Sequence, residues 1–118
     1  MVKTWRNFGE LAGQETEGQD YAIRICLRNG PVLVMAPHGG KIEPGTAEIA
    51  EAIAGDDHSF YTFEGIKADG NAVLHIQSHL FDEPQAIEAM KGAKIVVTVH
   101  GYADKEYGFV MVGGLILI

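Results

Sequence analysis

The chain has 118 residues, of which 47% are apolar and 21% charged, a composition typical of one globular domain, residues 1–118. The formal net charge of −7 disfavours nonspecific attraction to nucleic acid or to an acidic membrane surface. Cys26 is the single cysteine, which excludes an internal disulfide and favours a reducing compartment. The N-terminal residues lack the apolar stretch of a secretory signal, and no run is long enough to span a bilayer. We therefore expect a cytoplasmic protein with neither nucleic acid nor a membrane as its partner.

The first third of the chain predicts a short helix and two strands. The helix is expected near residues 8–14. Apolar side chains alternate with small or polar ones over residues 21–27, which predicts a strand with one wetter face. Asn29–Pro31 contains turn residues, and the apolar run 32–36 that follows reads as a buried strand. We expect these two strands to pair as a hairpin.

A helix is predicted next, over residues 46–54. Alanines favour it, Thr46 is its expected N-cap, and a glycine follows its last residue. Ile49 and Ile53 lie four residues apart and are expected to form the apolar stripe that faces the core.

The second half predicts further strands around one helix. Residues 58–63 and 72–77 read as strands joined by a turn, and Asp82 is the expected cap of a helix that runs to Lys91. Residues 94–99 form a second strongly apolar strand, and residues 109–112 are a weaker candidate. This order of elements predicts an α/β domain with a mixed sheet flanked by helices.

Two of the apolar strands end in a histidine, which is the main functional signal. His38 follows the run 32–36 and is followed by two glycines, with Glu43 five positions later, and His100 follows the run 94–99. Sites in open α/β sheets form outside the carboxyl ends of the strands. If the two strands are parallel neighbours, both imidazoles and the carboxylate can approach one ion. That donor set, with a fourth position left for water, is typical of a hydrolytic zinc site.

Other readings of these residue types stay open. The spacing between His38 and Glu43 is not specific, and a histidine at a strand end is often a satisfied loop or core residue. His75 and His79 lie four apart on a predicted strand and share a face, but no carboxylate accompanies them, so we interpret both as structural. Neither Ser59 nor Ser78 lies in the glycine-flanked turn of a serine hydrolase.

A family resemblance narrows the choice. The segment 36–50, Ala-Pro-His-Gly-Gly-Lys-Ile-Glu-Pro-Gly-Thr-Ala-Glu-Ile-Ala, resembles the signature of the phage-type poly-γ-glutamate hydrolases. Further blocks agree in the same order, at residues 59–65, 74–84, 99–102 and 113–115. The resemblance implies a zinc carboxypeptidase-like (phosphorylase/hydrolase-like) fold and hydrolysis of the γ-amide bonds of poly-γ-glutamate. It also implies that zinc is the cofactor and that His38, Glu43 and His100 bind it.

The resemblance also has a departure. Members of the family are considerably longer, and the glutamate general base would lie beyond the last matching block, so we expect the N-terminal part of a longer fold with weak or no activity. Glu64 is a weak candidate for a substitute base. Asp82 and Glu83 are further candidates, as a base or as a partner of a ligating histidine. The resemblance suggests a Bacillus phage or its chromosomal remnant as the source, with release by cell lysis.

Substrate binding and assembly remain expectations. Lys41 is a weak candidate for holding a substrate carboxylate, because a polyanionic substrate would need a cationic groove on this acidic chain; Arg24, Arg28 and Lys105 are further contributors. The apolar terminus, residues 113–118, is expected to be an edge element or a surface for homo-oligomers.

Two alternatives to the poly-γ-glutamate hydrolase are retained. One is a catalytically silent metal-binding or interaction module. The other is a zinc amidase or carboxypeptidase acting on small acyl-amino acids. Cobalt or nickel would accept the same ligands as zinc.

Overall fold

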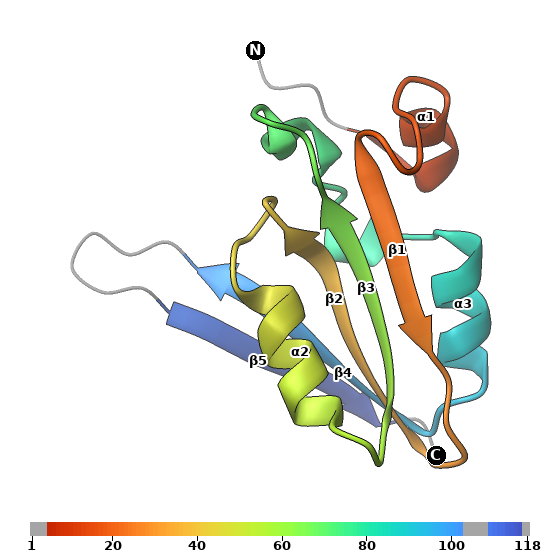
Figure 1. Cartoon of the computed structure of the whole chain (residues 1–118). Helices are drawn as coiled ribbons and strands as arrows, with labels where there is room; N and C mark the ends of the chain where they lie inside the picture. Colours follow the sequence, from red (N-terminus) through yellow and green to blue (C-terminus); the bar gives the residue numbers. More distant parts are fainter. Residues whose placement is uncertain (1–4, 103–108, 117–118) are drawn as a thin grey trace.

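One mixed β-sheet with helices on both faces forms the protein (Figure 1). The computed structural model describes residues 5–102 and 109–116. The five strands are β1 Tyr21–Cys26, β2 Val32–Gly40, β3 Ser59–Gly65, β4 Ile95–Tyr102 and β5 Phe109–Ile116. The helices are α1 Phe8–Ala12, α2 Thr46–Ala54 and α3 Pro84–Lys91, with two short 3₁₀ helices, η1 Asn71–Leu74 and η2 Ser78–Leu80. The predicted α/β class and mixed sheet are confirmed. None of the helices in the described part of the chain has the length and hydropathy needed to cross a membrane.

The sheet order is β1-β3-β2-β4-β5, so the predicted hairpin between β1 and β2 is wrong. β2 is parallel to both of its neighbours, β3 and β4, whereas β1 pairs with β3 in antiparallel fashion. The burial of each strand explains its place. Seven consecutive residues of β2 are buried, which requires a layer on each face, while half-exposed β1 suits an edge.

Two apolar clusters pack against opposite faces of the sheet. α2 covers one face, where Ala50 and Ala54 meet Val34 and Ala36 of β2. The other face carries α1 and α3, and its cluster includes Leu33 of β2 together with side chains of both helices. Figure 1 shows α2 in front of the sheet and α3 behind it.

Helix α2 has the predicted bounds but a different cap and a different buried face. Gly45, in a left-handed conformation, is the N-cap, and Thr46 lies inside the helix with its hydroxyl bonded to the carbonyl oxygens of His38 and Glu43. Ile53 is 43% exposed, whereas the alanines are buried. Small side chains face the core because they let the helix axis approach the sheet closely. Of the predicted isoleucine stripe, Ile49 packs against this cluster and is confirmed, whereas the placement of Ile53 is wrong.

Helix α3 begins one residue later than Asp82 would place it. Glu83 is the N-cap, and its buried carboxylate accepts hydrogen bonds from the backbone N–H groups of Gln85 and Ala86 and from the Tyr61 hydroxyl. Asp82 instead accepts a hydrogen bond from the backbone N–H of Phe8, at 2.7 Å. Capping by Asp82 is therefore corrected to capping by Glu83.

The strand predicted over residues 72–77 is wrong, because this region forms η1 and an irregular segment. Gly70 takes a left-handed conformation, and the Asn71 side chain exchanges hydrogen bonds with the backbone N–H and carbonyl of Lys67. This local turn competes with strand formation, as asparagine side chains commonly do. His75 is consequently placed by a turn and not by a sheet.

The apolar segment 113–116 belongs to β5, which pairs with β4 and lies at an edge of the sheet. The predicted edge element is thus confirmed, although the strand is longer than residues 109–112. Self-association through it stays a prediction. Lys105 and residues 117–118 lie outside the described residues.

Candidate metal centre

A bulge in β2 determines which way His38 points. Between Ala36 and Gly39 the register against β3 slips, so that three steps along β2 match two steps along β3. A bulge of this kind shifts which face the following side chains take. Gly39 faces α2, since a Cβ there would lie 3.1 Å from Ala47, and the His38 imidazole is turned to the opposite layer. There its Nε2 bonds the carbonyl oxygen of Ile76.

The loop after β2 folds back and brings Glu43 beside His38. The backbone N–H of Glu43 donates to the His38 carbonyl at 2.8 Å. Gly40 makes the turn possible, with φ of +61° and the backbone of Gly65 so close that a Cβ would lie 2.5 Å from its carbonyl oxygen. Only glycine meets both conditions.

Strand β4 carries His100 to the same place. β2 and β4 are parallel and hydrogen-bonded, with Met35 opposite Thr98, so the condition set by the sequence prediction is confirmed. The ring centroids of His38 and His100 lie 5.3 Å apart. Oε1 of Glu43 lies 3.3 Å from Nδ1 of His38 and 3.7 Å from Nδ1 of His100, and it accepts a 2.9 Å hydrogen bond from the Gly101 N–H. The structure therefore brings the three predicted ligands together; we call His38, Glu43 and His100 the candidate metal site.

The state of His38 fits a bound cation. The side chain is 2% exposed, and burial lowers the pKa of His38, so the imidazole is neutral. Its single proton is on Nε2, because a carbonyl oxygen can only accept. Nδ1 is therefore an unprotonated nitrogen, buried and without a hydrogen-bond partner among the described residues, facing a carboxylate oxygen. Two electron-rich atoms in this position are stabilised by a cation between them, and neutral imidazole with carboxylate suits zinc.

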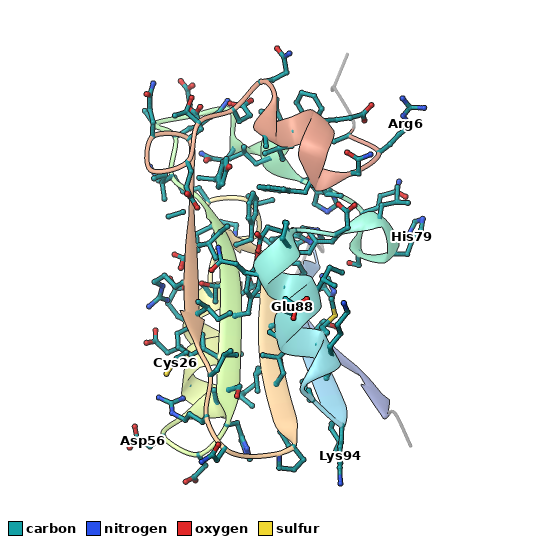
Figure 2. All side chains as sticks on the ribbon, turned by 90° about the vertical axis from the view of Figure 1, so that its right-hand side faces the viewer. Arg6, Cys26, Asp56, His79, Glu88 and Lys94 are labelled. Carbon is teal, nitrogen blue, oxygen red and sulfur yellow. The ribbon has the colours of Figure 1, made fainter. Side chains whose placement is uncertain are left out.

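His75 was missed as a member of this cluster. Its ring stacks on that of His38, with centroids 3.8 Å apart, and its Nε2 lies 3.6 Å from Oε2 of Glu43. Donor atoms of His38, Glu43 and His75 all lie within 4.8 Å of one another. His79 does not join them; it lies on η2, is exposed and points outward from the molecule (Figure 2). The predicted shared face of His75 and His79 is therefore wrong, and the turn chemistry at Gly70 and Asn71 was the signal that could have shown it.

The remaining carboxylates that were considered have partners elsewhere. Glu64 bonds the Arg24 guanidinium and the Thr62 hydroxyl. Asp82 accepts a hydrogen bond from a backbone N–H group of α1, and Glu83 accepts hydrogen bonds from backbone N–H groups of α3, as described above. The role of Glu64 as a general base stays a prediction.

Of the cationic side chains considered, only Lys41 extends from the loop that carries Glu43. It is exposed, and its ammonium bonds the carbonyl of Lys67 at 3.1 Å. Arg24 is occupied by Glu51 and Glu64, and Arg28 bonds the carbonyl of His58.

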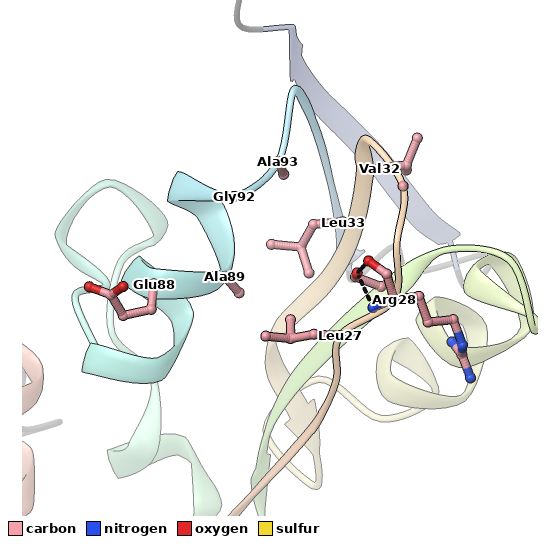
Figure 3. Close-up of a pocket in the computed structure, with 10 residues that line it drawn as sticks. Leu27, Arg28, Val32, Leu33, Glu88, Ala89, Gly92 and Ala93 are labelled. Carbon is pink, nitrogen blue, oxygen red and sulfur yellow. Dashed lines mark hydrogen bonds between the residues drawn. The ribbon is translucent and has the colours of Figure 1, made fainter.

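A separate hollow of about 120 Å³ lies at the other end of the sheet (Figure 3). Val32 and Leu33, at the start of β2, line it together with Ala89 of α3. Its volume is below the roughly 300–1,000 Å³ of pockets that hold small ligands. It also lies at the amino end of β2, away from His38, so it takes no part in the candidate metal site.

The chain is similar to known proteins over most of its length. The family model described as poly-gamma-glutamate hydrolase matches residues 5–116. Two relatives from Bacillus subtilis (strain 168) are UPF0714 protein YndL, 43% identical over 86% of this chain and 40% of its own length, and UPF0714 protein YmaC, 41% identical over 94% and 46%. The SPbeta prophage-derived UPF0714 protein YoqZ is 39% identical over 93% and 39%. The chain thus spans less than half the length of these relatives.

Solved structures share the fold. A bacteriophage poly-gamma-glutamate hydrolase matches with a TM-score of 0.85 and 34% identity over 89% of this chain and 51% of its own. YndL in a zinc-free form matches with a TM-score of 0.81 and 44% identity, over 86% and 49%.

Proposed function

Because the chain belongs to the poly-γ-glutamate hydrolase family, we propose that it is a metal-dependent hydrolase whose fold binds one zinc ion and whose substrate is the γ-glutamyl amide bond of poly-γ-glutamate. The proposed zinc ligands are Nδ1 of His38, Oε1 of Glu43 and Nδ1 of His100. When bound, zinc polarises a carbonyl group and lowers the pKa of coordinated water.

The observation that carries this proposal is the unpartnered, unprotonated Nδ1 of His38, 3.3 Å from a carboxylate oxygen. A buried nitrogen of this kind is costly unless something binds its lone pair. His100 approaches the same oxygen from the neighbouring strand, at 3.7 Å. Ligand atoms bonded to one zinc ion at about 2.0–2.2 Å lie about this far apart.

The chain's own residues have distinct tasks in this proposal. The Gly101 N–H holds Oε1 of Glu43, and the backbone bond between Glu43 and His38 fixes the loop, so the carboxylate stays beside both imidazoles. Lys41 is exposed two residues before Glu43, where its ammonium can attract a substrate carboxylate. Glu64 is retained as the weak candidate for the general base.

Metal content tests the first half of the proposal. After dialysis against zinc we expect roughly one tightly held ion per chain, as at other zinc sites with three protein ligands. His38→Ala is expected to lose it, and His79→Ala, which removes an exposed histidine, is the matched control. Equal zinc content in all three proteins would refute the ligand assignment.

Substrate cleavage tests the second half. Gel filtration of poly-γ-glutamate before and after incubation reports loss of chain length, and a chelator should abolish that loss. Intact polymer after incubation with the zinc-loaded protein would contradict hydrolysis without affecting the ligand assignment.

A second candidate, a metal-binding module without catalysis, is favoured by one observation. Within the described residues, Glu64, Asp82 and Glu83 bond to groups outside the candidate metal site. Stoichiometric zinc with intact polymer would support this candidate.

A further inference from the structure

One short segment, His75–Ser78, contacts all three members of the candidate metal site. We propose that this segment, which we call the strap, positions the three ligands, with Ser78 orienting His100 and His75 orienting Glu43. The inference rests on the proposed function, because it takes His38, Glu43 and His100 to be the zinc ligands.

The first contact is made by the strap's backbone. The carbonyl oxygen of Ile76 accepts a hydrogen bond from Nε2 of His38. This bond assigns the proton to Nε2 and leaves Nδ1 free to bind a metal. A histidine ligand typically donates its other ring N–H to a carbonyl or carboxylate in this way.

The second contact involves Nε2 of the other proposed ligand histidine, His100. The hydroxyl of Ser78 lies 3.3 Å from Nε2 of His100. A hydroxyl can accept the Nε2 proton, so Nδ1 is again the atom left to face Glu43. Both histidines would then bind through Nδ1, and both would be held from the strap side through Nε2.

The third contact is made by His75 with the carboxylate. Its Nε2 lies 3.6 Å from Oε2 of Glu43, whereas the two ligand histidines approach Oε1. The ring is fixed by stacking on His38 at an interplanar angle of 23°. His75 thus faces one oxygen of the carboxylate and leaves the other for the metal, which makes it a positioning residue.

The strap can act in this way because it is anchored. Leu74 and Ile76 are fully buried in the apolar cluster beneath α1 and α3. The backbone N–H of His75 bonds the carbonyl of Ala72, and the carbonyl of Gln77 accepts from Leu80. Gln77 itself is exposed, so the strap offers a control position within its own sequence.

Zinc affinity, measured by competition with a chromophoric chelator, tests the proposal. We expect Ser78→Ala and His75→Ala each to weaken zinc binding by about 10-fold to 100-fold, as loss of a ligand's hydrogen-bonding partner typically does. Gln77→Ala should bind like the unmodified protein. Ser78→Thr, which keeps the hydroxyl, should restore the affinity that Ser78→Ala loses.

A second readout separates positioning from folding. Urea unfolding in the presence of chelator should give the same midpoint for Ser78→Ala, His75→Ala and Gln77→Ala, because surface substitutions of this kind change stability little. If Ser78→Ala and His75→Ala bind zinc as tightly as Gln77→Ala, the strap proposal is overturned. If His38→Ala also keeps its zinc, the proposed ligand set fails as well, so the two failures are distinguishable.

Discussion

Nδ1 of His38 and Oε1 of Glu43 lie 3.3 Å apart inside the protein, and neither atom carries a proton for the other. The arrangement follows from the bond between Nε2 of His38 and the Ile76 carbonyl, which uses the only proton of the neutral ring. Its most direct consequence is that the metal-free protein holds an unfavourable pair that a cation relieves.

Zinc should therefore stabilise the fold. A ligand that binds only the folded state contributes about 2.7 kcal/mol when its free concentration is 100 times its dissociation constant. We expect thermal unfolding to shift upward by several degrees on adding zinc and to return on adding chelator. A melting temperature of His38→Ala that rises just as much would contradict binding at this site.

Stability of the metal-free protein should fall in mild acid because of His38. Burial lowers the pKa of His38 from the ordinary value near 6.5. Just below that pH, the His38 imidazole is protonated in the unfolded chain but still neutral in the folded chain. Lowering the pH through this window therefore favours unfolding, by up to about 1.4 kcal/mol per pH unit. Urea unfolding with chelator between about pH 7.5 and about pH 5.5 measures the slope.

His38→Gln has no such proton, and its pH slope should be flatter, whereas His79→Gln should keep the original slope. Equal slopes in both variants would show that another group is responsible.

Gly40→Ala should be markedly destabilising. An alanine at a φ of +61° costs about 1–2 kcal/mol, and its Cβ would press on the Gly65 carbonyl from 2.5 Å, which adds about 1–3 kcal/mol. Gly70→Ala is the matched control, since its φ is +74° with open space around the Cβ position, and it should lose only the first amount. Denaturant unfolding compares the two, and equal losses would rule out crowding at Gly40.

The cap of α3 offers a test of the corrected assignment. Glu83→Ala removes the helix cap and leaves the buried Tyr61 hydroxyl without its acceptor, so we expect a loss of about 2 kcal/mol or more. Asp82→Ala loses one exposed hydrogen bond, to the N–H of Phe8, and should cost less than about 1 kcal/mol. The reverse order of the two losses in urea unfolding would restore Asp82 as the cap.

Glu64→Gln examines the side chain that the sequence singled out as a substitute base. Its carboxylate pairs with Arg24, which is 43% exposed, so the stability change should stay within about 1 kcal/mol and zinc affinity should be unchanged. Isothermal titration with zinc measures the affinity. Weaker zinc binding would show that Glu64 acts on the metal site after all, and normal binding with loss of hydrolysis would support it as the base.

The sequence predicted the sheet's central strands because their apolar runs are continuous and buried on both faces. The proximity of His38, Glu43 and His100 was also predicted, because the carboxyl ends of parallel neighbouring strands meet at one edge of the sheet. The order of strands could not be predicted from the sequence. An Asn-Gly-Pro turn indicates where β1 ends, but it does not show whether β2 or β3 pairs with β1.

His75 was misjudged for a related reason. The apolar residues within 72–77 fit a strand, but the bonds between Asn71 and Lys67 form a local turn that no periodicity reveals. The bulge at His38 is likewise invisible in the sequence, although it decides which layer the imidazole enters.

The pairing of β2 with β4 joins positions some sixty residues apart in the chain, and His38 and His100 stand on either side of that seam. A growing polypeptide consequently lacks the proposed ligand His100 until its last parallel strand has docked. Zinc binding through all three proposed ligands would then require the completed sheet. Folding intermediates that lack this strand would not bind zinc through His100.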